Sequence, residues 1–197
     1  MRIITGTAKG CKLKTPAGMS TRTTSDRMKE SLFSILGEDV LENRVLDIFA
    51  GTGGLGLEAL SRGAASAVFI DKATADIIAF NAQHTNLADK CRILAGDVFV
   101  HLQRLEQQGE KFNMVFCDPP YHQGFAHKAL ELLDKGTLLA EDALVIVEHG
   151  GDENDLPATT RLRLVKNQRY GKVSQLSFYH LPKQENILAG QEGGASE

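Results

Sequence analysis

The strongest constraint on the fold is an apolar segment that runs into a cluster of glycines and then into a helix-forming stretch. Residues 45–48 are apolar apart from one acid, Gly51, Gly53 and Gly56 follow, and residues 57–60 favour a helix. Glycine permits the tight turn and close backbone approach that such a junction needs around a ligand. The helix N-terminus that follows it is electropositive. The segment therefore predicts an α/β chain with a ligand-binding loop at the carboxyl end of a strand.

The three glycines match the pattern G-x-G-x-x-G, which is typical of dinucleotide sites, but Asp47 favours another ligand. A dinucleotide places its pyrophosphate at this loop, and a carboxylate four residues before Gly51 would repel it. S-adenosylmethionine carries a sulfonium and an ammonium group and no phosphate, so the same carboxylate would attract it. An alternative role for Asp47, as a cap at the strand end, stays open.

Two further acids follow the next predicted strands. Asp71 ends the apolar stretch 67–70 and can accept hydrogen bonds from ribose hydroxyls, a feature shared by several adenosine ligands. Asp97 follows the stretch 91–95 and can accept from an adenine amino group while Val98 packs on the ring. Asp97 can equally cap the next helix, and the two roles are compatible.

The apolar stretch 114–117 ends at a rigid polar corner made of Asp118, Pro119, Pro120 and Tyr121. Consecutive prolines can neither continue a helix nor donate to a sheet ladder, so the strand must end here. The corner suits a flat heterocycle with an exocyclic amine. Asp118 and the Pro119 carbonyl can accept hydrogen bonds from the two N–H groups of the amine, and Tyr121 can stack on the ring. A solvated turn is the alternative for the corner taken alone.

Together these motifs resemble those of class I S-adenosylmethionine-dependent methyltransferases that modify amino nitrogens of bases. From residue 1 to residue 180 the chain resembles one family, the RsmD family, most closely. The segments that carry the resemblance are 2–6, 10–13, 24–27, 46–53, 58–64 and 118–121. Two positions depart from the family pattern: Thr23 stands where proline is usual, and Asp71 where glutamate is often found.

The resemblance implies methyl transfer to the N2 amine of a guanine in small-subunit (16S) ribosomal RNA, either free or within an assembling 30S subunit. It implies that the catalytic residues are Asp118, Pro119, Pro120 and Tyr121. It also implies that the cofactor, S-adenosyl-L-methionine, is bound by Asp47, Phe49, Gly51, Gly53, Asp71, Lys72, Asp97 and Val98.

Positive charge is concentrated in two segments, although the chain has a net charge of −3. Residues 1–29 hold seven basic residues and one acid, and residues 161–172 hold five basic residues and no acid. Such segments indicate a local phosphate-binding surface. Ordinary solvated charge is the alternative, above all for residues 161–172. We expect the N-terminal segment to bind RNA through Arg2, Lys9, Lys12, Lys14, Arg22 and Arg27.

The alternation of apolar stretches with helical ones predicts a Rossmann-like class I methyltransferase fold, with a seven-stranded, mostly parallel sheet and helices on both faces. Residues 1–24 are expected to form a small basic β-hairpin arm, residues 25–182 the methyltransferase domain, and residues 183–197 a frayed tail. The predicted strands are 44–48, 67–71, 91–95, 113–117, 143–148, 161–169 and 173–180, the last antiparallel. The predicted helices are 54–62, 74–87, 97–107, 123–134 and one that starts at Ser25 or Asp26 with an apolar stripe of Met28, Leu32, Ile35 and Leu36.

Composition favours a compact cytoplasmic enzyme with a single substantial core, and we expect the protein to be a monomer. The chain has 197 residues, of which 42% are hydrophobic, and no apolar run approaches membrane-spanning length. Its three cysteines lack zinc spacing, and disulfides are not expected in a reducing compartment. His122 and His127 do not share a helix face, so no metal site is expected.

Three other functions are compatible with parts of this pattern. The Asp118 corner would also serve an adenine-N6 methyltransferase of DNA or RNA, although no long target-recognition insertion is present. A non-catalytic RNA-binding assembly protein could keep the fold, but intact Asp47, Gly51, Gly53 and Asp118 argue against it. An NAD-dependent oxidoreductase is the third alternative.

Overall fold

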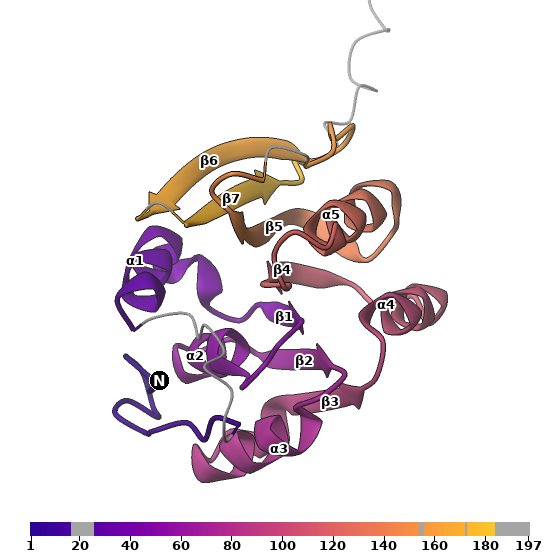
Figure 1. Ribbon diagram of the computed structural model, residues 1–197. Helices are drawn as coiled ribbons and strands as arrows, with labels where there is room; N and C mark the ends of the chain where they lie inside the picture. The colour runs from indigo at the N-terminus through magenta and orange to yellow at the C-terminus, as the bar shows by residue number, and fades with distance from the viewer. Residues whose placement is uncertain (17–25, 154–155, 172, 184–197) are drawn as a thin grey trace, which may run out of the picture.

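The computed structural model describes residues 1–16, 26–153, 156–171 and 173–183. Arg22 and Lys172, the predicted boundary of the arm at residue 24, and the predicted tail beyond residue 183 lie outside the described residues. Within them, the predicted fold is confirmed: a seven-stranded sheet is covered by helices on both faces (Figure 1).

The sheet has the strand order β3-β2-β1-β4-β5-β7-β6. Strands β1 to β5 pair in parallel, whereas β7 runs antiparallel to both β5 and β6, as the sequence predicted for the last strand. The strands are β1 (Arg44–Ile48), β2 (Ser66–Asp71), β3 (Cys91–Ala95), β4 (Phe112–Cys117), β5 (Leu139–Gly150), β6 (Arg163–Tyr170) and β7 (Ser174–His180).

Strand β5 begins four residues earlier than the sequence predicted. The polar pair Glu141-Asp142 interrupts the apolar pattern, and Asp142 has a positive φ of 64°. Both side chains are exposed, while the backbone at Leu139 still pairs with Phe112 across a register shift. Alternation of polar and apolar residues is lost at such an irregularity, so periodicity could not reveal the strand start.

Each face of the sheet has its own buried core (Figure 1). Helices α1, α2 and α3 cover one face around Phe33, Leu57 and Phe69, and helices α4 and α5 cover the other around Leu102 and Leu130. The helices are α1 (Asp26–Leu36), α2 (Gly54–Ser61), α3 (Ala75–His84), α4 (Val98–Gln107) and α5 (Phe125–Lys135), with short 3-10 turns η1 (Gly37–Val40) and η2 (Ala88–Lys90).

The N-terminal residues form the predicted hairpin and are held on α2. Arg2 and Lys12 make an antiparallel bridge, and the backbone N–H of Ile3 donates to the Cys11 carbonyl at 2.9 Å. The Glu58 carboxylate on α2 accepts hydrogen bonds from the backbone N–H groups of Ile4 (2.8 Å) and Thr5 (3.0 Å). The hairpin is therefore attached to the α/β body through its backbone, which leaves its long basic side chains on the outside.

A buried ion pair joins the hairpin, α1 and α2. Lys29 and Glu58 are both fully buried, with Lys29 Nζ 3.1 Å from Glu58 Oε2 and 2.6 Å from the Arg2 carbonyl. Burial lowers the pKa of Lys29, and the neighbouring Glu58 opposes that effect. Lys29 is one of the seven basic residues counted in residues 1–29, but it lies on the buried face of α1 and cannot reach a phosphate.

We predict that Glu58→Gln destabilises the protein by about 3–5 kcal/mol, because it leaves the Lys29 charge buried without a carboxylate. Urea denaturation followed by circular dichroism measures the loss. Glu131→Gln is the control, since its partner Lys135 is on the surface and the urea midpoint should hardly move. An equally small effect of both substitutions would contradict a structural role for the buried pair.

Candidate functional site

The carboxyl ends of the parallel strands gather the predicted site residues at one edge of the sheet. Strands β1 and β4 are neighbours with Ile48 opposite Cys117, so the glycine loop after β1 and the Asp118 corner after β4 begin side by side. Asp71 ends β2, and Asp97 follows β3 by two residues. The strand order reverses at β1 and β4, which is where open α/β sheets bind ligands.

The glycine loop needs its glycines for two different physical reasons. Gly51 and Gly53 have positive φ values of 55° and 77°, which residues other than glycine rarely adopt. A Cβ atom added at Gly51 would meet nothing within 4 Å, whereas one added at Gly56 would lie 2.3 Å from the Phe69 ring. Gly51 thus borders open space, and Gly56 allows α2 to pack closely on β2.

Asp47 lies beneath this loop rather than on its surface. It is 2% exposed, and its Oδ2 atom accepts the backbone N–H of Gly56 at 2.8 Å. Burial raises the pKa of Asp47 to about 8, opposed by the Gly56 hydrogen bond and assisted by the nearby Asp71 charge. The structure therefore gives Asp47 a capping contact at the start of α2; its action on a ligand stays a prediction.

Asp71 also fixes the loop while remaining half-exposed. Its Oδ2 accepts the Gly51 N–H at 2.9 Å, and its Oδ1 accepts the N–H groups of Ala73 (2.8 Å) and Thr74 (3.0 Å). The Thr74 hydroxyl donates to the Gly51 carbonyl. The adjacent Lys72 is exposed. The acid is thus rigidly placed beside the open space at Gly51.

Asp97 caps α4, which confirms one of the two roles that the sequence left open. Its Oδ1 accepts the backbone N–H groups of Phe99 (2.9 Å) and Val100 (3.1 Å). The Asp97 side chain is exposed, whereas Val98 is buried below it. Asp97 therefore remains accessible to a ligand at the same time as it caps the helix.

The Asp118 corner has one buried proline and a firmly held aromatic ring. Pro119 is buried, Pro120 is exposed, and Asp118 and Tyr121 are half-buried. The Tyr121 hydroxyl donates to Glu148 Oε1 at 2.7 Å, and Ser174 Oγ lies 3.2 Å from the Tyr121 hydroxyl oxygen. Sequence reasoning missed Glu148, although it follows an apolar stretch at the carboxyl end of β5, the same signal that identified Asp71.

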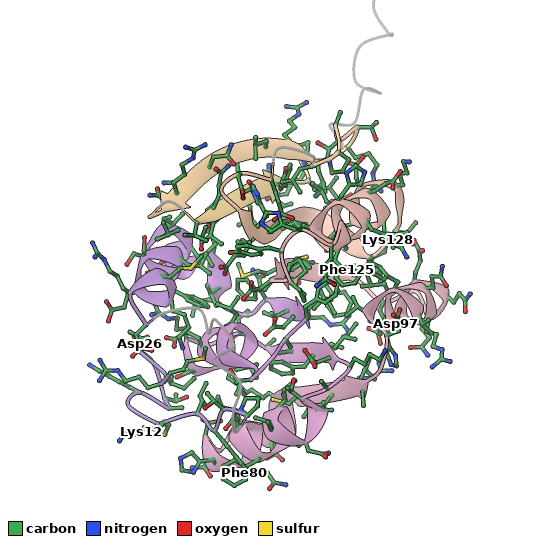
Figure 2. The ribbon with its side chains drawn as sticks, in the orientation of Figure 1. Lys12, Asp26, Phe80, Asp97, Phe125 and Lys128 are labelled. Carbon is green, nitrogen blue, oxygen red and sulfur yellow. The ribbon has the colours of Figure 1, made fainter. Side chains whose placement is uncertain are left out.

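Three phenylalanines that come from separate segments meet at this edge. The ring of Phe49 stacks on Phe125 at a centroid distance of 5.6 Å and meets Phe99 edge-on at 6.0 Å. Phe49 has a positive φ of 58°, which is uncommon for a bulky residue and is typical of sites with functional constraints. Figure 2 shows Phe125 and Lys128 on α5, with Asp97 near α4; the Lys128 ammonium lies 4.0 Å from the centre of the Phe99 ring. The sequence had indicated only Phe49.

The predicted RNA-binding cations that the structure describes lie on the surface. Lys9, Lys12 and Arg27 are exposed, and Arg2 pairs with Asp26 at 3.2 Å. Lys14 holds its ammonium 5.0 Å from the centre of the Phe80 ring. These cations therefore remain accessible to a polyanion.

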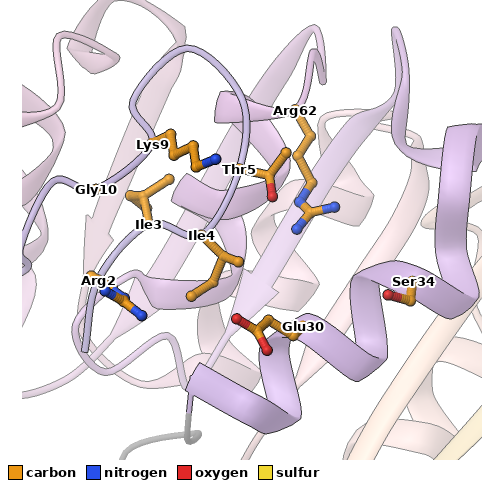
Figure 3. A pocket seen from close by; sticks show the side chains of 9 residues that line it. All are labelled: Arg2, Ile3, Ile4, Thr5, Lys9, Gly10, Glu30, Ser34 and Arg62. Carbon is orange, nitrogen blue, oxygen red and sulfur yellow. The ribbon is translucent and has the colours of Figure 1, made fainter.

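A pocket of about 530 Å³ opens between the hairpin, α1 and α2 (Figure 3). Arg2, Lys9 and Arg62 line it together with Glu30. Arg62 is a further cation near the arm, which sequence reasoning did not identify. The Arg62 Nε atom donates to Glu58 at 2.9 Å, so this side chain also contributes to the attachment of the arm.

Buried Asn81 on α3 connects the hairpin strand to the glycine loop. Its Oδ1 accepts the Lys14 N–H at 2.7 Å, and its Nδ2 donates to the carbonyls of Lys14 (3.1 Å) and Thr52 (2.9 Å). The Asn81 side chain thus connects the hairpin directly to the glycine loop, in addition to the attachment through Glu58.

Within the described ranges, no group of three or more histidine, cysteine, aspartate or glutamate side chains is arranged to hold a metal ion. No helix in the same ranges is long and apolar enough to cross a membrane.

Comparisons with known proteins place these features in a family. Over residues 1–180 the chain matches the family described as Conserved hypothetical protein 95. It is 37% identical over 174 residues to YlbH of Bacillus subtilis, covering 87% of this chain and 94% of that protein. It is 39% identical over 159 residues to ribosomal RNA small subunit methyltransferase D of Escherichia coli, covering 80% of this chain and 78% of the relative.

A solved structure of a relative has the same fold. The Escherichia coli protein yhhF superposes with a TM-score of 0.79 at 36% identity, over 93% of this chain and 99% of that chain. The chain therefore belongs to the family described as Conserved hypothetical protein 95, the RsmD family that its sequence motifs resemble.

Proposed function

We propose that this protein transfers a methyl group from S-adenosylmethionine to the exocyclic N2 amine of a guanine in 16S ribosomal RNA. The observation that carries the proposal is the position of the Asp118 corner directly beside the glycine loop, on paired strands β4 and β1. A methyl donor on the loop and an amine at the corner would thereby be neighbours. The name of the Escherichia coli relative, a ribosomal RNA small subunit methyltransferase, supports RNA as the substrate.

The residues at the loop fit the proposed cofactor. The open space at Gly51 admits a ligand against the backbone, and half-exposed Asp71 stands beside it where ribose hydroxyls can donate. Exposed Asp97 can accept from an adenine amino group near Val98, and Phe49 and Lys72 border the same edge. Buried Asp47 has a raised pKa of about 8, and a cationic ligand beside it would stabilise its charged form, whereas a pyrophosphate would not. When bound, the cofactor supplies an electrophilic methyl group on its sulfonium.

The corner addresses the weak nucleophilicity of an aromatic amine. Such an amine donates its lone pair into the ring, so it attacks poorly unless its geometry changes. Asp118 and the Pro119 carbonyl would accept its two N–H bonds and favour a more tetrahedral nitrogen, while Tyr121 fixes the plane of the base. Positioning for in-line attack then supplies much of the rate. A base that is stacked in a helix would first have to be turned out.

The test is transfer of tritium from methyl-labelled S-adenosylmethionine to 16S ribosomal RNA, offered free and within 30S subunits, followed by nucleoside analysis. We expect the label in N2-methylguanosine. Label in N6-methyladenosine would favour the adenine methyltransferase instead. RNA binding without any transfer would favour a non-catalytic assembly protein.

We predict that Asp118→Ala abolishes methyl transfer and leaves the affinity for S-adenosylmethionine within a few-fold, because Asp118 would contact the amine and not the adenosine. Single-turnover assays measure transfer, and calorimetry measures cofactor affinity. Asp89→Ala, at an exposed acid before β3, is the control and should behave like the wild type. Robust turnover by Asp118→Ala would show that other groups hold the amine.

The basic arm is proposed to bind RNA phosphates through Lys9, Lys12, Lys14, Arg2 and Arg27, with Arg22 outside the described residues. Lys9→Gln with Lys12→Gln should raise the apparent KM for RNA and lower the log–log salt slope by roughly 0.7–0.9 for each lost contact. Cofactor affinity should not change. Lys90→Gln with Lys111→Gln, near the amino ends of β3 and β4, is the matched control. A wild-type salt slope in the arm variant, with activity lost only in proportion to thermal stability, would contradict this proposal.

A further inference from the structure

The Tyr121 ring is held at its far end by two buried polar side chains. Its hydroxyl donates to Glu148 Oε1 at 2.7 Å, with Ser174 Oγ 3.2 Å away. Glu148 is 4% exposed and Ser174 is 7% exposed. Removing a carboxylate from water is costly, and the hydrogen bond from Tyr121 offsets part of that cost.

The two partners come from strands whose relative positions are fixed by the sheet. Cys117 on β4 lies opposite Val147 on β5, so Asp118 and Glu148 are the residues that directly follow this pair on the two parallel strands. Ser174 begins β7 and lies opposite Gly150 on β5. Three adjacent strands therefore determine where the end of the Tyr121 side chain lies, although Tyr121 itself belongs to a turn.

This arrangement restrains the direction of the Tyr121 ring axis, and because a phenol O–H bond prefers to lie in the ring plane, the positions of the two partners also orient the ring about that axis. A hydrogen bond at the phenol oxygen fixes the tilt of the ring from the end opposite its backbone. A stacking platform needs such a fixed plane, because small errors in the position of a reacting group reduce rates strongly. Packing alone would not require a buried carboxylate at this point.

We propose that Glu148 and Ser174 are positioning residues that hold the Tyr121 ring in the plane on which the target base stacks. The proposal rests on the proposed function for the identity of the base. It assigns the β5–β7 pair a direct part in the geometry of the catalytic corner, and it makes the Tyr121 hydroxyl an anchor rather than a contact with the substrate.

A double-mutant cycle tests the proposal kinetically. Tyr121→Phe removes only the hydroxyl, and we expect it to lower kcat by about ten-fold to a hundred-fold. Glu148→Ala should lower kcat to a similar extent, and the double variant should be no worse than either one. Glu148→Gln keeps an acceptor oxygen and should restore most of kcat. The matched controls are Tyr179→Phe and Ser177→Ala, which remove hydroxyls from the same sheet and should keep kcat.

A second measurement needs neither cofactor nor RNA. The chain has three tyrosines, Tyr121, Tyr170 and Tyr179, so 3-fluorotyrosine labelling gives three assignable fluorine signals. Glu148→Ala should shift or broaden the Tyr121 signal and leave the Tyr170 signal in place. An unchanged Tyr121 signal, or effects on kcat that multiply in the double variant, would overturn the proposal. Absence of methyl transfer by the wild-type protein would instead refute the proposed function, and the fluorine spectra would still decide whether the ring is anchored.

Discussion

The parallel pairing of β1 with β4 is the interaction on which the rest of the site depends. Ile48 and Cys117 are the last residues of these strands and lie opposite each other in the center of the sheet. Because both strands are buried on both faces, their register is fixed by the core and not by the loops. The glycine loop and the Asp118 corner directly follow these strands, so the register also sets the distance between the loop and the corner.

The glycine loop is kept in shape by side chains from several elements rather than by its own sequence. Asp47 binds the N–H of Gly56, Asp71 binds the N–H of Gly51, and Asn81 binds the carbonyl of Thr52. Left-handed glycines lose much conformational entropy on folding, so such a loop needs external hydrogen bonds to stay ordered. A loop organised in this way is prepared for a ligand before the ligand arrives, which reduces the cost of binding.

Side chains from several elements also attach the basic arm to the α/β body. Glu58 accepts two backbone N–H groups of the hairpin and pairs with buried Lys29, and Asn81 binds the hairpin strand at Lys14. The described part of the arm, residues 1–16, is therefore part of the folded unit. Because the hairpin backbone is attached in this way, the basic residues on it start from fixed backbone positions relative to the Asp118 corner.

Much of the architecture could be predicted from the sequence because the signals are local. Apolar stretches, glycines and prolines located the strands to within a few residues, and the acids at strand ends lie at one edge of the sheet because parallel strands share a direction. The RsmD-like motifs identified the family because they are also short patterns of neighbouring residues. The cap formed by Asp97 was also visible in the sequence.

Tertiary structure alone decided the features that depend on distant partners. Lys29 looks like a surface cation in the sequence, and only the approach of Glu58 allows it to be buried. Phe125 meets Phe49 from another segment, and Ser174 reaches Tyr121 from another strand. Residue patterns report the period and chemistry of one segment, whereas these contacts arise from the order in which the sheet assembles its strands. The sequence by itself determined which groups stand at the edge of the sheet; the packing of separate strands and helices decided how each group is held.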